Sequence, residues 1–374
     1  MSVSPLEPMR TNSRQASLPL LMPQWSRGQP EHLYEQSVAA EVHRHRRRLI
    51  CNAARTLAVL YAVWFVMTRR DKRLSRQWGS THLMKVLGAC ARLALGALGV
   101  HLSIRWDGLP EGACPTPAER LSTSDAAMFS IMPHGAYPLS MLALAVPRFR
   151  TEPRLMTWRL RLAGASVLYD IPVVRELLLL LGGREATEST MRGAFADGCS
   201  VAVNPGGIFE QVHTDHKQER VFVQARLGFL RIAMAAGKPV IPTYCFGENQ
   251  LFHTYAFARP LQKWLLRKTR VGLPLFTGAW GLPFGAPLPT KTALVVGREV
   301  AVGPPNPSPT DEQVEEVFGR YVAEVRRLFD AHAHEHLPPD VVARGLTIER
   351  IGKGGVTVPV AVPPPAPLGA PSRL

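Results

Sequence analysis

The sequence predicts an α/β fold for residues 105–337, preceded by apolar helices that associate with a membrane. From Ser124 onward, short apolar runs typical of buried strands alternate with segments of helical periodicity. Two apolar segments bracketed by arginines, 49–67 and 82–100, come before them. The chain has 374 residues, of which 46% are hydrophobic, so it can bury a sizeable core. This alternation favours an α/β sandwich with its sites at strand ends.

The N-terminal part is expected to divide in two. Residues 1–45 should be a disordered leader, because their first forty are polar and dotted with proline and lack the pattern of a signal peptide. Residues 46–104 should be membrane-associated hydrophobic helices. Asn52, Arg55 and Thr56 interrupt the first apolar segment, so its unbroken part is shorter than the roughly 20 residues that a spanning helix needs.

Basic runs on both sides of this segment favour a monotopic arrangement, with arginines reaching to anionic headgroups. A pair of core helices in a soluble domain is the alternative.

The remaining elements follow in order along the chain. Strands are expected at Ala126–Met132, Ser200–Val203, Pro239–Phe246 and Ala293–Val302, and helices at Pro138–Val146, Val173–Leu181, Glu188–Phe195, Phe222–Ala236 and Thr310–Glu335. The last helix has the clearest signals, because Thr310 and Gln313 suit a capping box ahead of an apolar stripe. Residues 338–374 are expected to be a proline-rich, disordered tail.

The charge and the cysteines narrow the class of protein. A net charge of +15 favours an anionic partner: nucleic acid, an anionic lipid surface or a phosphate-bearing substrate such as a coenzyme A thioester. Zinc-finger spacings, RNA-binding signatures and a Walker-type loop are missing from the sequence, so nucleic acid is disfavoured. The five cysteines are odd in number and scattered, which favours a reducing compartment.

The most informative segment is Ala126–Gly135, where an apolar run stops at Pro133 and His134 follows. Proline ends a strand ladder because it lacks an N–H, and glycine lets backbone or substrate approach closely. Histidine has a free pKa that suits proton transfer near neutral pH. A lone histidine after a strand is often only structural, so the neighbouring segments must decide.

Glycines and a glutamate follow the next strand in the segment Asn204–Glu210. Gly206 and Gly207 allow backbone N–H groups to face an oxyanion or a phosphate, and Glu210 could orient a histidine. An ordinary turn with a surface glutamate is the alternative.

Two further segments add polar groups at expected element ends. Arg226, early in an amphipathic helix, suits phosphate binding, as Arg231 does less clearly, although both also fit a solvated helix face. Glu248 and Asn249 come just past a strand, where α/β sites gather, and an ordinary polar turn is the alternative.

Other chemistries find less support. The histidines show no recognised ligand spacing, so no metal is expected at His213 and His216 or at His332, His334 and His336. A serine-hydrolase elbow is missing from the sequence.

Taken together, these segments resemble the type 2 diacylglycerol acyltransferase family, which includes monoacylglycerol and wax-alcohol acyltransferases. The motifs are Met132-Pro-His-Gly135, Val203-Asn-Pro-Gly-Gly-Ile-Phe-Glu210, Arg226-Leu-Gly-Phe229 and Val240-Ile-Pro-Thr-Tyr-Cys-Phe-Gly-Glu-Asn249, followed by Gly281-Leu-Pro-Phe284 and Val295-Val-Gly-Arg298. The likeness covers residues 95–337. Met132 departs from the family, which has a histidine there. A more distant likeness is to glycerolipid acyltransferases with His-x4-Asp, but Leu139 stands at the aspartate position.

The resemblance implies a glycerolipid-acyltransferase-like αβ sandwich that transfers an acyl group from acyl-CoA to diacylglycerol. It implies no cofactor besides the acyl-CoA co-substrate, and an endoplasmic-reticulum or lipid-droplet location with the catalytic domain facing the cytosol. We expect His134 to be the base and Glu210, with Glu248 behind it, to orient it. The expected substrate-binding residues are Pro133, Gly135, Asn204, Gly206, Gly207, Arg226, Gly228, Phe229, Glu248 and Asn249.

The alternatives are a long-chain (wax) alcohol or monoacylglycerol acceptor and, outside the enzymes, an inactive lipid-binding membrane protein.

Overall fold

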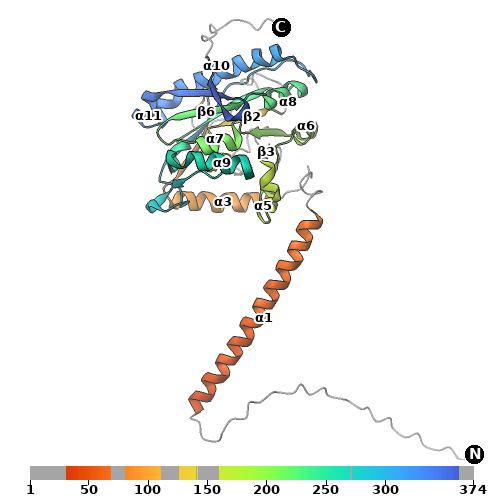
Figure 1. Cartoon of the computed structure of the whole chain (residues 1–374), viewed down its shortest axis with the longest axis vertical. Helices are drawn as coiled ribbons and strands as arrows, with labels where there is room; N and C mark the ends of the chain where they lie inside the picture. Colours follow the sequence, from red (N-terminus) through yellow and green to blue (C-terminus); the bar gives the residue numbers. More distant parts are fainter. Residues whose placement is uncertain are drawn as a thin grey trace, which may run out of the picture. The chain divides into compact units, whose positions relative to one another are not determined.

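The computed structural model describes residues 31–68, 81–110, 126–139, 141, 160–269 and 272–361. The chain divides into two compact units, Met1–Trp64 and Phe65–Leu374. Helix α1 (Glu31–Met67) supplies the described part of the first unit (Figure 1). In the described ranges, one helix is long and apolar enough to cross a membrane: Ala39–Met67, with a mean hydropathy of 1.7.

Helix α1 differs from the expectation at its start and near its centre. It begins at Glu31, inside the expected leader, because the residues that follow include many good helix formers such as Glu, Ala and Arg. It also continues through the polar residues near its centre, where the Thr56 hydroxyl donates to the Asn52 carbonyl at 3.0 Å. The second apolar segment forms α3 (Thr81–Ala97), which at 17 residues is shorter than a typical span.

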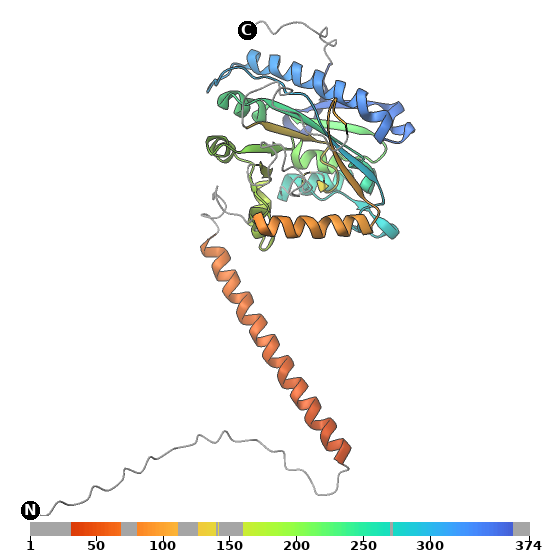
Figure 2. The same ribbon diagram turned by 180° about the vertical axis from the view of Figure 1, so that it is seen from behind.

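A seven-stranded sheet organises the second unit (Figures 1 and 2). The strand order is β1 (His101–Trp106), β10 (Lys291–Val296), β7 (Val240–Phe246), β2 (Met128–Met132), β5 (Ser200–Val203), β3 (Leu160–Gly164) and β4 (Gly183–Glu185). All neighbours are parallel except β10 and β7. Because β2 lies between the parallel strands β5 and β7, the residues that follow these three strands meet at one edge of the sheet.

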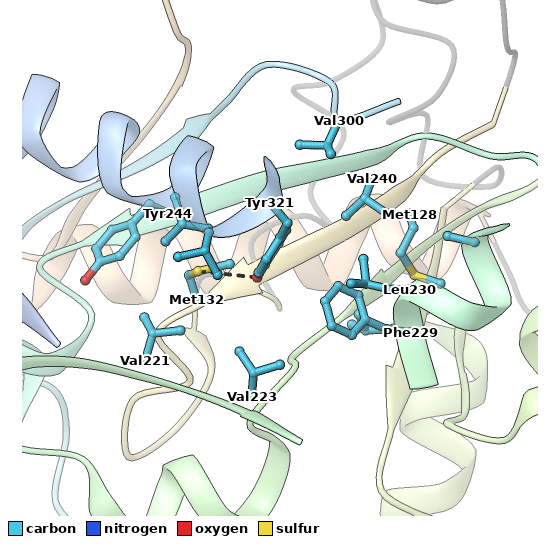
Figure 3. Close-up of a cluster of buried hydrophobic side chains, with 14 of the residues drawn as sticks. Met128, Met132, Val221, Val223, Phe229, Leu230, Val240, Tyr244, Val300 and Tyr321 are labelled. Atoms are coloured by element: carbon cyan, nitrogen blue, oxygen red, sulfur yellow. Dashed lines mark hydrogen bonds between the residues drawn. The ribbon is translucent and has the colours of Figure 1, made fainter. Parts of the chain in front are cut away.

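Helices α6 (Glu188–Ala196), α8 (Gly228–Ala236) and α10 (Asp311–His336) pack their apolar residues into one core with β2, β5 and β7 (Figure 3). The alternate side chains of the strands, such as Phe129, Ile131 and Ile241, form a second cluster. Helix α10 begins with the expected capping box at Thr310 and Gln313. The mixed α/β class is therefore confirmed.

The expected helix Phe222–Ala236 is wrong in its first half. Residues Glu219–Gln224 form strand β6, and α8 begins only at Gly228. Leu227 separates the two elements with a left-handed φ of +48°. Strand β6 pairs in parallel with β11 (Leu346–Ile351), so a partner distant in the sequence overrides the local helical periodicity.

The same pairing corrects the expected tail. Residues 338–361 form α11 (Pro339–Arg344), β11 and β12 (Thr357–Pro359), and β11 lies between β12 and β6 in a three-stranded sheet. Leu346, Ile348 and Ile351 are buried there, which ties the segment to the domain. Residues 362–374 of the expected tail lie outside the described residues.

The other expected elements agree with the structure to within a few residues. Helices α5 (Val174–Leu180) and α6 and strands β2, β5 and β7 lie where the sequence predicts them, whereas β10 ends at Val296 and not at the expected Val302. In the expected helix Pro138–Val146, Leu139 and Met141 are helical and most of the rest lies outside the described residues.

Candidate active site

His134 follows the central strand β2 directly. The Met132–Pro133 peptide is cis, and Gly135 adopts a positive φ of +66°, so the chain turns sharply around the histidine. Met132 points the other way, into the core (Figure 3). The Tyr321 hydroxyl donates to the Met132 sulfur at 3.7 Å and also lies 2.6 Å from the Ser130 hydroxyl. Met132, the position at which the motif differs from the family, is therefore a core residue whose side chain points away from His134.

The His134 ring is held by the residue that follows it. Nδ1 lies 3.1 Å from the carbonyl oxygen of Gly135. A carbonyl can only accept, so Nδ1 carries the proton and Nε2 keeps its lone pair. Burial lowers the pKa of His134, which keeps the ring neutral near pH 7. The geometry thus leaves Nε2 able to accept a proton.

The side chain of Glu210 binds the main chain of His134. It lies on α7 (Gly207–His213), is buried, and its Oε1 accepts a hydrogen bond from the His134 backbone N–H at 3.2 Å. Burial raises the pKa of Glu210 well above its usual value, nearby Glu219 adds to this, and the amides of His134 and Gly206 oppose it. The structure therefore brings Glu210 and His134 together, with the carboxyl group against the peptide.

The glycine pair beside Glu210 is packed inside the protein. A side chain at Gly206 would collide with the Glu210 carboxyl group and would lie 2.7 Å from the Phe222 carbonyl oxygen. The Gly207 N–H donates to the Asn204 carbonyl at 3.1 Å. The Gly207 amide therefore closes the turn instead of facing a ligand, and Gly206 packs against Glu210, which differs from the expectation for this pair.

Glu248 supports the opposite side of the turn. It is buried, its Oε1 accepts from the Leu139 backbone N–H at 2.7 Å, and its Oε2 accepts from the Cys245 thiol at 3.3 Å. A side chain at Gly135 would lie 2.8 Å from its Cγ. Glu248 and Glu210, from two different strand ends, thus flank the backbone that carries His134.

Asn249 joins a buried network around a residue that the sequence reasoning missed. Its Nδ2 donates to Glu219 Oε2 at 3.1 Å, the Tyr244 hydroxyl donates to the same oxygen at 2.7 Å, and Gln250 donates to Glu219 Oε1 at 3.0 Å. Burial raises the pKa of Glu219. An acid just before the apolar run Val221–Val223 is the available signal, but the sequence predicts a helix that begins at Phe222, inside this run.

Four expected substrate residues line a separate pocket of about 970 Å³: Asn204, Arg226, Gly228 and Phe229. His134 does not line this pocket. The predicted residues therefore form two groups, one around His134 and one in the pocket, and the segment after β5 contributes to both. Both side-chain amide atoms of Asn204 are buried without a hydrogen-bond partner among the described residues. Asn204 is therefore a polar group still able to bind a ligand.

The pocket walls are strongly basic. Arg192, Arg226, Arg231 and Lys353 line it, against the single acid Glu188. Arg231 is paired with Asp311 and donates to the Pro309 carbonyl, and Arg192 donates to Glu188 at 2.8 Å.

The side chains of Arg226 and Lys353 have no partner in the parts of the chain that are described. Lys353 belongs to the connection between β11 and β12, and the expectation of a disordered tail concealed it.

The C-terminal histidines form a cluster whose members have other partners. Ligand atoms of His332, Glu335 and His336 lie within 4.8 Å of one another. The His332 Nε2 is 2.9 Å from Asp107 Oδ1, and Glu335 pairs with Arg105.

The comparisons with known proteins agree with the motifs. A family model described as diacylglycerol acyltransferase matches residues 116–343, more than half of the chain. The chain therefore belongs to the diacylglycerol acyltransferase family, as the motifs predicted. No solved structure matches it.

Several curated relatives are similar to this chain. It is 31% identical over 194 residues to diacylglycerol O-acyltransferase 2-like protein 6 of Mus musculus, covering 47% of this chain and 56% of the relative. It is 31% identical over 223 residues to 2-acylglycerol O-acyltransferase 3 of Homo sapiens, covering 53% and 63%. It is 27% identical over 198 residues to acyl-CoA wax alcohol acyltransferase 2 of Mus musculus, covering 49% and 57%. The matches thus span less than two thirds of each relative.

Proposed function

We propose that this protein is an acyl-CoA-dependent O-acyltransferase that converts diacylglycerol to triacylglycerol. The observation that carries the proposal is the His134 ring, whose Nδ1 is held by the Gly135 carbonyl so that Nε2 is left as a base. The separate basic pocket suits the phosphates of coenzyme A. The names of the relatives support the same class of reaction.

The reaction is a direct transfer without an acyl-enzyme. His134 Nε2 takes the proton of the acceptor hydroxyl as its oxygen attacks the thioester carbonyl carbon. The new C–O bond forms, the C–S bond breaks, and coenzyme A leaves as a thiolate that receives a proton from the histidinium or from solvent. A thiolate is a good leaving group, so a strong general acid is not required.

The Gly135 amide is the best-placed donor for the oxyanion. No described residue accepts a hydrogen bond from it, whereas the Gly207 amide donates to the Asn204 carbonyl. Because the Gly135 N–H lies next to the base in the chain, it can donate to the oxygen of the thioester carbonyl that the acceptor attacks. Glu210 is a positioning residue here, because it holds the His134 peptide and not the reacting atoms.

Arg226 and Lys353 hold the phosphates of coenzyme A in this proposal. Both are cations without a side-chain partner among the described residues, and Arg226 lies just before the N-terminus of α8, where a helix favours anions. Arg231 is the weaker candidate, since Asp311 and Pro309 already occupy its guanidinium.

The acceptor is a membrane lipid, so the reaction takes place at a membrane, proposed to be the endoplasmic reticulum or a lipid droplet, with the catalytic unit in the cytosol. The long apolar α1 supports membrane association. The buried Cys199 and Cys245 do not form disulfides, which suits a reducing compartment. Two relatives are named for 2-acylglycerol and wax-alcohol acceptors, which makes monoacylglycerol and long-chain alcohols the acceptors to compare.

The test is an acyl-transfer assay on isolated membranes with labelled oleoyl-CoA and three acceptors: diacylglycerol, monoacylglycerol and a long-chain alcohol. Wild type should form triacylglycerol, and His134→Ala should not. The control is His101→Ala, which removes an exposed imidazole at the start of β1. A His134→Ala protein that keeps most of its activity would remove this residue as the base, and a wild type without any acyl product would favour an inactive lipid-binding protein.

A further inference from the structure

A second set of large apolar side chains is exposed on the catalytic unit, outside the N-terminal helices. These residues, here called the aromatic face, are Phe257, Leu261, Trp264, Trp280, Leu282 and Phe284. Phe257 and Trp280 are 78% and 79% exposed. Such a concentration of exposed aromatic side chains is unusual for a surface that meets only water.

Helix α9 (Arg259–Thr269) exposes large apolar side chains that a helix on a water-facing surface would bury. It buries Gln262 and exposes Leu261 and Trp264. Its other exposed side chains include Lys263, Arg267 and Lys268. Tryptophan and leucine beside basic residues are typical of a helix that lies in the interface of a bilayer.

The sequence around the aromatic face, residues 249–298, carries basic but no acidic side chains. No Asp or Glu occurs between Glu248 and Glu299. The same stretch contains the basic residues Arg259, Lys263, Arg267, Lys268, Arg270, Lys291 and Arg298. A surface of this charge is attracted to anionic headgroups. It also repels a second copy of itself, which argues against a symmetric dimer through this face.

Aromatic contacts connect this face to the active site. Phe284 packs against Phe276 with ring centroids 5.2 Å apart, and Phe276 packs against Tyr137 at 5.1 Å. Tyr137 is itself 42% exposed and lies three residues after His134. An apolar path thus leads from the exposed face to the turn that carries the base.

The apolar helix α3 ends in the same region. Leu95 and Leu98 pack against the cluster that contains Phe252 and Phe276, while Leu93 is 73% exposed. Figures 1 and 2 both show α3 and α9 toward one end of the catalytic unit, with α10 at the opposite end. A membrane in contact with α3 would therefore lie at the same end of the unit as α9.

We propose that the aromatic face rests in the headgroup region of an anionic bilayer, with the side chains of Trp264 and Trp280 among the lipids. The base at His134 then opens toward the membrane along Tyr137, and a lipid acceptor reaches it without crossing water. The acceptor route rests on the proposed function, whereas the membrane contact itself does not.

The test measures depth in the membrane for the full chain in vesicles of equal parts phosphatidylcholine and phosphatidylserine. Trp264→Cys and Trp280→Cys are labelled singly with an environment-sensitive fluorophore, in a background where Cys51, Cys90 and Cys114 are serine. The control is Glu316→Cys on α10, where the glutamate side chain is 76% exposed. Quenchers are a lipid spin-labelled in its acyl chain and iodide in the water.

Labels at 264 and 280 should be quenched several-fold more strongly by the spin-labelled lipid than the label at 316, and should be shielded from iodide. Shielding should weaken when phosphatidylserine is replaced by phosphatidylcholine. Equal iodide access at all three positions would overturn the proposal. Shielding without lipid quenching, together with energy transfer between chains, would also overturn it by showing a second copy on the face.

An activity measurement tests the acceptor route separately. Trp264→Ser/Trp280→Ser should raise the apparent KM for diacylglycerol in vesicles several-fold and leave the KM for acyl-CoA unchanged. Val356→Ser/Val358→Ser, which removes exposed apolar residues elsewhere, is the control. An unchanged KM for diacylglycerol would reject the route. Because the depth measurement needs no acyl transfer, failure of the proposed function would leave its result interpretable.

Discussion

The backbone N–H of His134 donates to Glu210 Oε1 at 3.2 Å, so the glutamate holds the histidine by its peptide while the ring is held by the Gly135 carbonyl. This separates two tasks that a catalytic dyad usually combines. The carbonyl sets the tautomer, and the carboxyl group sets where the turn places the ring. The consequences for mutants differ accordingly.

Glu210→Gln should keep much of the activity, whereas Glu210→Ala should lose it. Burial raises the pKa of Glu210, so its charge is not the essential property. Glutamine still presents an oxygen to the His134 amide. Alanine leaves that amide without its acceptor, at a cost of about 1–3 kcal/mol that displaces the base and lowers kcat more than tenfold. Equal loss of kcat in both variants would show that the carboxylate itself takes part in the chemistry.

The pH profile should have its acid limb below pH 6.5. Burial lowers the pKa of His134 from 6.5, and only the neutral ring can accept a proton. Activity is therefore full above this lowered pKa and is lost as the pH falls through it. The measurement is kcat/KM from about pH 5 to 8, with thermal melts at each pH to separate unfolding from titration. A limb above pH 6.5 would contradict the burial of the ring.

The two neighbouring glycines should respond very differently to alanine. A methyl group at Gly206 collides with the Glu210 carboxyl group and lies 2.7 Å from the Phe222 carbonyl, so Gly206→Ala must displace Glu210 and reduce kcat sharply. Gly207 has a positive φ of +54° but open space around it. Gly207→Ala should therefore cost about 1–2 kcal/mol of stability and retain most activity. Thermal melts and kcat for the matched pair provide the check, and equal effects would contradict this packing.

The sequence predicted the ends of the central strands well, because local signals mark them. Proline and glycine around His134, and the glycine pair before Glu210, announce strand ends and turns through their own backbone chemistry. The structure then shows that the strands before these two residues, β2 and β5, are parallel neighbours, so both residues lie at one edge of the sheet. The actual contact, from an amide to a carboxyl oxygen 76 residues away, depends on how α7 packs and could not be predicted.

Two of the errors, the helix expected from Phe222 and the disordered tail, share one non-local cause. Strand β6 resembles a helix in isolation, because Phe222 and Leu230 fit a helical spacing, and β11 was hidden in a proline-rich tail. The two segments pair with each other as strands, as in the register Leu346 with Glu219. The missed residues Glu219 and Lys353 both belong to this sheet region, so one unforeseen pairing explains both omissions.

Removal of Arg226 or Lys353 should weaken binding of acyl-CoA, whereas removal of Arg231 should not do so directly. Arg226→Ala and Lys353→Ala each delete a cation without a side-chain partner in the described pocket wall, so the KM for acyl-CoA should rise several-fold. The dependence of that KM on salt should also become shallower. Arg231→Ala instead breaks the pairing with Asp311 and serves as the matched control. An unchanged KM in both test variants would place coenzyme A elsewhere.

Restoring the family histidine at position 132 should not increase activity. The Met132 side chain is fully buried between β2 and α10, where the Tyr321 hydroxyl donates to its sulfur at 3.7 Å. In Met132→His the imidazole would enter this core, facing Tyr321 and not His134. Its Nδ1 or Nε2 could pair with the Tyr321 hydroxyl, and its other nitrogen would be buried without a partner, which costs about 1–3 kcal/mol. We expect the melting temperature to fall by several degrees and kcat to stay within about twofold of wild type. Tyr321→Phe separates the hydrogen bond of this contact from its packing, because it removes the hydroxyl but keeps the ring. A clear rise in kcat for Met132→His would instead show that the residue at position 132 reaches the reacting groups.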